Sequence, residues 1–445
     1  MTTKHLPKFA AIVMMATALN AMAVGLDWLE TDSAAAIAAR TARDFPYSVE
    51  EAAAMIRTEL PDVTDEQINT FIDRKYLETC IIDGKRRVFR KGVRNLMLLN
   101  PDLNGGVRSR GATASPARIS YVDSVLNHCR GTNPAGGAHK VRYRFSIEVP
   151  WHEALDGDTL RVWMPLPHES ARQHHVKILN SYPRNYIGSD SSLSVHNTIY
   201  FEQPVRSGQT TRFEYEGEFV TCGQYFSPSY ILANIRPYDT QSELYRRYTA
   251  EEAPHMPRLD SLAREITGSE KNPYLCSELV YDYIINHYLW AGAREYSTID
   301  CIPEYVINEG HGDCGQVSLL YISLMRTLGI PARWESGWML HPGEKNYHDW
   351  AEVYFEGVGW VPVDVSFGRY SNSSDAEIRN FYSTGMDAHR FASNRGICGE
   401  LYPAKRFVRS ETVDFQPGEV ECSKGNLFYP AWNQSLELIE ITPVE

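Results

Sequence analysis

The sequence lacks an excess of positive charge. Its 445 residues include 44 Lys and Arg against 56 Asp and Glu, a formal net charge of −12. Proteins that bind nucleic acid usually present a basic stripe or a high pI. The one basic cluster, Lys85-Arg86-Arg87 with Arg90 and Lys91, is more typical of a solvated hairpin and helix start. The sequence therefore predicts no nucleic-acid partner.

Long apolar runs are also scarce. A membrane-spanning helix needs about 20 apolar residues, and no stretch after the N-terminus reaches that length. At the N-terminus, Lys4 and Lys8 flank the start of the short apolar run Phe9–Ala16, and Ala21-Met22-Ala23 follows. This order is typical of a signal peptide with a small-x-small cleavage site, although a buried N-terminal helix is an alternative. We therefore expect residues 1–23 to be a signal peptide, no integral membrane segment after its removal, and a periplasmic or secreted protein.

Closely spaced cysteine pairs are absent as well. The eight cysteines are scattered, and no C-x-x-C occurs. Zinc ribbons and thioredoxin-type redox sites both need such pairs, so neither is predicted. His311 lies three residues before Cys314, but no second close pair completes a metal site, so we predict no metal. In an exported protein the cysteines could form disulfides, but the sequence assigns no bridge.

The composition is that of a folded protein of two to four domains. Hydrophobic residues make up 43% of the chain and aromatic residues 11%, enough to bury several cores. Residues 24–135 are predicted to be mainly helical, with two capping boxes of which the first joins Ser48 and Glu51. Residues 136–240 alternate apolar and polar positions, as in Val141–Ile147, which predicts a β-sandwich-like domain.

The first residue that carries chemistry is Cys314. It follows Gly312-Asp313 and precedes apolar residues at helical spacing, so Asp313 is a predicted N-cap and Cys314 lies in the first turn. The N–H groups and dipole of a helix start favour a thiolate. The backbone N–H of Cys314 is also available to an oxyanion. The alternative is a small buried core residue.

A proton carrier and a carboxylate follow in a predicted hairpin. His348 lies near the start of one strand, and Asp364 stands alone among apolar residues of the returning strand. Asp364 could accept a hydrogen bond from His348 and fix its ring. Because strand residues alternate between faces, this pairing requires an odd loop or a bulge, which Gly357-Val358-Gly359 can supply. Otherwise His348 is a structural histidine and Asp364 faces solvent.

Together these blocks resemble the transglutaminase-like superfamily over about residues 270–370. The matching runs are Gly312-Asp313-Cys314, Leu328–Arg333, His348–Val353 and Gly359–Asp364. The resemblance implies an α+β fold with a papain-like, transglutaminase-like catalytic core. It implies Cys314 as nucleophile, His348 as general base and acid, and Asp364 as the orienting carboxylate. The preceding β-rich region also resembles a domain often placed before this core in bacterial members, so residues 241–445 are expected to be the catalytic domain with a C-terminal β extension.

This resemblance predicts an exported cysteine protease or amidase. It would act at amide bonds of peptides or proteins through a thiol acyl-enzyme, with no cofactor. A lysine amine as acyl acceptor would instead give a protein-crosslinking transglutaminase. A noncatalytic protein-binding module on the same fold is the alternative from another class. Trp290 and Tyr296 are candidates for a second oxyanion donor, which no motif marks.

Overall fold

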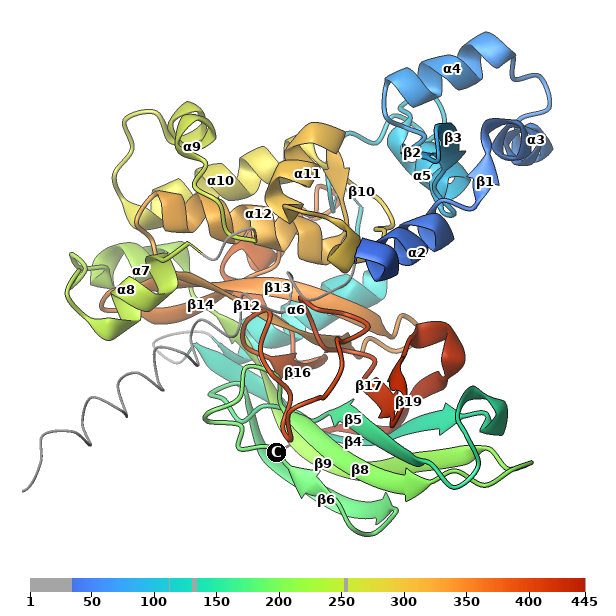
Figure 1. Cartoon of the computed structure of the whole chain (residues 1–445). Helices are drawn as coiled ribbons and strands as arrows, with labels where there is room; N and C mark the ends of the chain where they lie inside the picture. The colour runs from blue at the N-terminus through green and yellow to red at the C-terminus, as the bar shows by residue number, and fades with distance from the viewer. Residues whose placement is uncertain (1–33, 112, 130–133, 252–254, 445) are drawn as a thin grey trace, which may run out of the picture.

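The computed structural model describes residues 34–444 except 112, 130–133 and 252–254 (Figure 1). The expected signal peptide, residues 1–23, lies outside this part of the chain. The described residues form helices and several sheets, which confirms the α+β class. None of the helices in this part is both long and apolar enough to cross a membrane.

The N-terminal unit is a group of helices around a small antiparallel sheet in the order β1-β3-β2. Its elements are α2 (Ala34–Asp44), β1 (Tyr47–Ser48), α3 (Val49–Glu59), α4 (Asp65–Asp73), β2 (Thr79–Ile82), β3 (Lys85–Val88) and α5 (Gly92–Leu99). Both predicted capping boxes are present; in the first, the Ser48 hydroxyl accepts from the Glu51 N–H and the Glu51 carboxylate accepts from the Ser48 N–H. Ile56, Ile68 and Leu96 form the centre of a separate hydrophobic core.

Two five-stranded sheets enclose a second core. One has the order β15-β9-β4-β19 with β6 paired to β9, and the other has the order β18-β17-β5-β8-β7. Their strands are β4 (Ala135–Val149), β5 (Thr159–Pro165), β6 (Gln173–Tyr182), β7 (Ile187–Gly188), β8 (Thr198–Pro204), β9 (Thr211–Tyr225), β15 (Gly385–Met386), β17 (Glu419–Cys422), β18 (Gly425–Leu427) and β19 (Asn433–Pro443). Phe145 of β4 and Val162 of β5 share this core, because alternate residues of each strand point inward. The alternation in β4 thus predicted its buried face.

The sandwich is completed by the end of the chain. Strand β19 pairs along β4 from Asn433 opposite Glu148 to Pro443 opposite His139, and β17 pairs with β5. The helix α6 (Pro116–His128) packs on β4 and β9. Strands β17 and β19, from the C-terminal β extension, therefore belong to the sandwich sheets.

A four-stranded antiparallel sheet under a layer of helices forms the remaining unit (Figure 1). The sheet has the order β14-β13-β12-β16, with β12 (Ala332–Met339), β13 (Asn346–Phe355), β14 (Gly359–Val363) and β16 (Arg390–Asn394). The helices are α7 (Pro228–Asn234), α8 (Glu243–Thr249), α9 (Asp260–Thr267), α10 (Pro273–His287), α11 (Ile302–Glu309) and α12 (Cys314–Thr327). Helix α12 is apolar around most of its circumference because it is buried between other helices and the sheet, where Leu320 and Leu324 share a core with Trp334.

The β13–β14 hairpin has the odd loop that the predicted pairing requires. Phe355 pairs with Gly359, so Glu356-Gly357-Val358 is a three-residue loop, shifted by one residue from the expected position. Gly357 adopts a φ of +84°, a left-handed conformation that favours glycine. The register places His348 and Asp364 on one face of the sheet.

Candidate active site

Cys314 is the first residue of α12, as predicted. The Asp313 carboxylate accepts a hydrogen bond from the Gln316 N–H, and the Gln316 side chain accepts from the Asp313 N–H, which completes a capping box. The helix start therefore faces a cleft of about 630 Å³, which Cys314 lines. The first backbone N–H groups of a helix have no partner within the helix, so the Cys314 N–H can serve a ligand in the cleft.

The thiol makes its hydrogen bond to Asp349. The Sγ atom of Cys314 donates to Oδ2 of Asp349 at 3.2 Å. The other oxygen, Oδ1, accepts from Nε2 of Gln416 at 2.6 Å, and both residues line the cleft. Burial, then the charges of Asp349 and Asp313, raise the pKa of the Cys314 thiol well above its ordinary value. Burial, then the charges of Asp414 and Asp313, likewise raise the pKa of Asp349.

His348 and Asp364 form a buried pair. Nε2 of His348 lies 2.7 Å from Oδ2 of Asp364, and Arg390 lies 3.2 Å from the same oxygen. The His348 ring stacks on Phe367 with 5.0 Å between the ring centroids. Burial alone would raise the pKa of Asp364, but His348 and Arg390 outweigh burial and hold this pKa below its ordinary value. Asp364 is therefore a carboxylate, suited to orient an imidazole.

A direct contact links two of the three predicted site residues, His348 and Asp364. In the part of the chain described here, no hydrogen bond links Cys314 to His348, and the thiol contacts the next residue, Asp349. Neighbouring residues of a strand point to opposite faces, so His348 and Asp349 leave β13 in different directions. The role of all three residues as a catalytic triad stays a prediction.

Sequence reasoning missed three residues of the site. Asp349 could have been found, because it is an ionisable residue in a strand that is otherwise largely apolar, and the structure buries it. Arg390 and Gln416 come from segments without a recognisable motif, and no signal in the sequence pointed to them.

The cleft is lined by charges of both signs, and its acidic residues are Glu295, Asp313, Asp349, Glu411 and Asp414. Five cations line it: Arg43, Arg90, Lys91, Arg94 and Arg294. The first four come from the N-terminal unit, so this unit contributes a wall of the cleft. Trp290 and Tyr296 also line it, as expected for candidate oxyanion donors, but the Tyr296 hydroxyl already donates to Asp313 at 2.6 Å.

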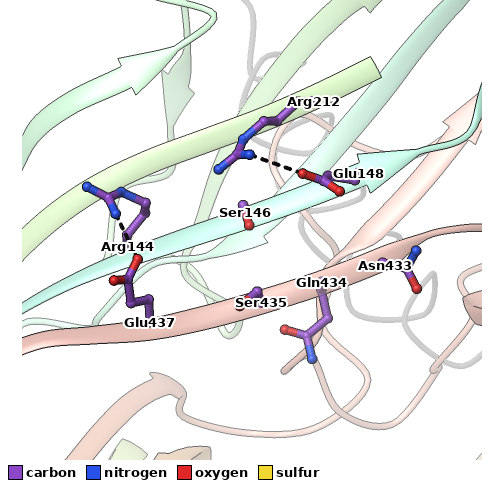
Figure 2. Close-up of a pocket in the computed structure, with 8 residues that line it drawn as sticks. All are labelled: Arg144, Ser146, Glu148, Arg212, Asn433, Gln434, Ser435 and Glu437. Carbon is purple, nitrogen blue, oxygen red and sulfur yellow. Dashed lines mark hydrogen bonds and ion pairs between the residues drawn. The ribbon is translucent and has the colours of Figure 1, made fainter. Parts of the chain in front are cut away.

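A second hollow lies on the sandwich and differs in character. It is open on the face of β4, β9 and β19, where Arg144 reaches Glu437 and Arg212 reaches Glu148 (Figure 2). Its charged side chains pair with one another, and no cysteine or histidine lines it. The cleft at Cys314 is therefore the better candidate for chemistry.

The fold and the matching motifs define a protein with a transglutaminase-like core. Residues 260–365 match the family model described as the transglutaminase-like superfamily. This match confirms the resemblance that the motifs predicted for this part of the chain.

Two relatives are similar over part of their length. An uncharacterized protein of Bacillus subtilis (strain 168), YebA, is 25% identical over 202 residues, which are 39% of this chain and 27% of YebA. An uncharacterized protein of Haemophilus influenzae (strain ATCC 51907 / DSM 11121 / KW20 / Rd) is 27% identical over 234 residues, 44% of this chain and 62% of that protein. The chain thus spans less than two thirds of each relative.

Two solved structures are also similar. A candidate cysteine protease from Cytophaga hutchinsonii is 14% identical with a TM-score of 0.46, over 70% of this chain and 92% of that one. The periplasmic domain of TgpA from Pseudomonas aeruginosa is 14% identical with a TM-score of 0.28, over 59% of this chain and 94% of that one.

Proposed function

We propose that this protein is an exported cysteine protease or amidase in which Cys314, His348 and Asp364 act together on amide bonds of peptides or proteins. The observation that carries the proposal is the buried His348–Asp364 pair, in which His348 directly precedes Asp349, the residue that accepts the hydrogen bond of the Cys314 thiol. The parts of an acyl-transfer triad, a carboxylate-oriented imidazole and a cysteine at a helix start, are thus present and support an enzyme over a binding module.

The proton path follows from the ring nitrogens. Asp364 engages Nε2 of His348, which leaves Nδ1 to accept the thiol proton. Because Sγ of Cys314 donates to Asp349 and His348 points to the other face of β13 in this structure, Cys314 and His348 must move toward each other before the proton passes. The resulting thiolate beside an imidazolium is the nucleophilic form.

Hydrolysis of the amide then takes two steps, acylation of Cys314 and hydrolysis of the resulting thioester. The thiolate attacks the amide carbonyl and forms a C–S bond, and the Cys314 N–H stabilises the oxyanion. The C–N bond breaks as His348 gives its proton to the leaving amine, which leaves a thioester on Cys314. Water attacks the thioester and passes a proton to His348. The carboxylic acid product leaves and the His348 proton returns to sulfur.

The cations that the N-terminal unit contributes to the cleft indicate the kind of substrate. Arg90 pairs with Asp44 at 2.7 Å, whereas the contact recorded for Arg94 is with the ring of Trp290, 5.4 Å from the centroid. A cation over an indole keeps its charge available to a ligand. We therefore expect peptides with Asp or Glu near the scissile bond to be preferred over neutral ones.

Hydrolysis of a mixed peptide library tests the proposal. Mass spectrometry should find new carboxyl termini with the wild-type protein and none with Cys314→Ala. Cys301→Ala is a matched control, because Cys301 also lies at a helix start, as the N-cap of α11, but outside the cleft. Products carrying an added primary amine would favour the transglutaminase alternative. Absence of both products, and of any acyl group on Cys314, would leave the binding module.

Export is part of the proposal and rests on the pattern in residues 1–23. The mass of the protein recovered from intact cells and from their periplasm or medium tests it. We expect a mature protein that begins near Val24 outside the cytoplasm. A full-length protein in the cytoplasm would contradict export without affecting the proposed chemistry.

A further inference from the structure

Three buried ligand-type side chains gather away from the cleft. His341 follows β12, and Asp387 and His389 lie in the connection between β15 and β16. Their exposed fractions are 1%, 0% and 7%. None of the three lines the cleft at Cys314, and the proposed reaction does not use them. They hold together segments that lie almost 50 residues apart in the sequence.

The spacing of their atoms is that of a metal site. Oδ1 of Asp387 lies 3.1 Å from Nε2 of His341 and 3.6 Å from Nδ1 of His389. All three ligand atoms lie within 4.8 Å of one another. Bonds of about 2.0–2.1 Å in a tetrahedral zinc site put two ligand atoms about 3.3–3.4 Å apart. The two distances bracket this value, so an ion needs only small shifts of the rings.

Two hydrogen bonds hold the second carboxylate oxygen of Asp387, Oδ2, in place. Oδ2 accepts a hydrogen bond from the Tyr382 hydroxyl at 3.0 Å and from Arg390 at 2.9 Å. This arrangement aims Oδ1 at the two imidazoles. Partners that hold the outer oxygen of a carboxylate in this way are typical of metal sites.

One histidine offers a ring nitrogen to a metal. Nδ1 of His389 is buried and, among the described residues, makes no hydrogen bond. Neutral imidazole nitrogen is the ligand form, and a bound ion would satisfy the buried Nδ1.

The charges around the three side chains are compatible with a bound cation. Arg390 is positive but pairs with two carboxylates, Asp387 at 2.9 Å and Asp364 at 3.2 Å. The ring of Tyr121 covers both histidines, at 4.2 Å from the His389 ring and 5.0 Å from the His341 ring. Tyr121 is only partly buried, as is His139, whose ring lies 5.4 Å from the His389 ring.

We propose that His341, Asp387 and His389 bind one divalent transition-metal ion, with Zn²⁺ as the best match and water as the fourth ligand. Two imidazoles and one carboxylate are ligands that Zn²⁺ prefers over Mg²⁺ or Ca²⁺, which take oxygen. The ion would cross-link the end of β12 to the β15–β16 connection. No step of the proposed reaction passes through this site, although Arg390 contacts both Asp387 and Asp364.

Zinc titration of the untagged mature protein, stripped with a chelator, tests the site. Competition with a chromophoric chelator should show one tight equivalent of Zn²⁺, and Zn²⁺ should raise the melting temperature. His341→Gln and His389→Gln should each weaken binding at least about tenfold. His255→Gln is a matched control, because His255 is 2% exposed and also lacks a hydrogen bond among the described residues.

Two further measurements on the wild-type protein test the proposal even if a variant fails to fold. The Co²⁺-loaded wild type should show visible ligand-field bands without a thiolate charge-transfer band, which separates this site from the cysteines. Crystals of the wild type soaked in Zn²⁺ should give an anomalous peak between the three side chains. Absence of that peak, or zinc binding that both glutamine variants retain, would overturn the proposal.

Discussion

The thiol of Cys314 lies between a helix start, which favours a thiolate, and two carboxyl groups, which oppose one. A helix N-terminus stabilises an anion by about 0.3–1 kcal/mol, and by up to about 2 kcal/mol in partly buried sites. Two like charges about 4 Å apart repel by about 4 kcal/mol at an effective dielectric of about 20. Asp349 at 3.2 Å therefore outweighs the helix whenever it is ionised. While Sγ donates to Asp349 the thiol is neutral, so activation by His348 requires the thiol to leave Asp349.

Asp349→Asn should accelerate alkylation of Cys314 at neutral pH. The amide keeps the shape and the contact with Gln416 but removes the negative charge, so the thiol pKa falls. Each unit by which the pKa falls increases the thiolate fraction about tenfold. Mass spectrometry of the Cys314 peptide measures the rate, with the Cys301 peptide as an internal reference. An unchanged ratio of the two rates would contradict this role of Asp349.

Asp364→Asn should lower kcat and leave KM nearly unchanged. The variant removes the charge that orients His348 and stabilises its imidazolium, so we expect a loss of about 10²–10⁴-fold. Steady-state kinetics on a peptide found with the library would measure it. Asp190→Asn, on an exposed loop, is the control. A change in kcat of less than about threefold would remove Asp364 from the mechanism.

At the scale of elements, the sequence predicted those features of the site that depend on residues close together in the chain. The capping box at Asp313 and the periodic apolar residues after it determine where α12 begins. The pairing of His348 with Asp364 followed from hairpin parity, which is a local property of the β13–β14 loop. Gln416 was not predictable, because it reaches Asp349 from a loop 67 residues further along the chain.

Gly357→Ala should destabilise the β13–β14 hairpin. A left-handed conformation costs a residue with a side chain about 1–2 kcal/mol. At Gly357 a new Cβ would also lie 2.3 Å from the Asn234 carbonyl oxygen. Gly343→Ala is a matched control, with a φ of +80° and open space around its Cβ. Chemical denaturation should show a larger loss for Gly357→Ala, and equal losses would exclude the clash as a cause.

At the scale of the whole molecule, long-range pairing limited the prediction. The alternation in β4 predicted a half-buried strand, but nothing in it specified β19 as a neighbour almost 300 residues later. Any strand with a suitable apolar pattern can pair at the edge of a sheet, and tertiary packing determines which strand does. For the same reason the sequence did not show that the N-terminal unit borders the cleft through Arg90 and Arg94.

Glu78 joins the N-terminal unit to the helical layer and should make stability depend on pH. Burial raises the pKa of Glu78 from 4.5 to about 7, although Arg294 opposes the shift. The folded protein therefore keeps a proton that the unfolded chain releases. The stability from this group is fully present below about pH 4.5 and is lost as the pH rises through about 7.

Glu78→Gln should remove this dependence. The amide stays neutral, so the variant should gain stability relative to wild type above about pH 7, by at most about 3 kcal/mol. Urea denaturation from about pH 5 to 8 measures the difference. A difference between the two proteins that does not change with pH would contradict the account.

The most direct test of the central claim is the rate of iodoacetamide alkylation at Cys314 as a function of pH, in wild type and in His348→Ala. If His348 and Asp364 activate the thiol, Cys314 should react faster than Cys301 near about pH 6, and the advantage should disappear in the variant. Labelling that rises only toward about pH 9, equally in both proteins, would contradict a thiolate–imidazolium pair. It would leave Cys314 as a structural residue of a binding module.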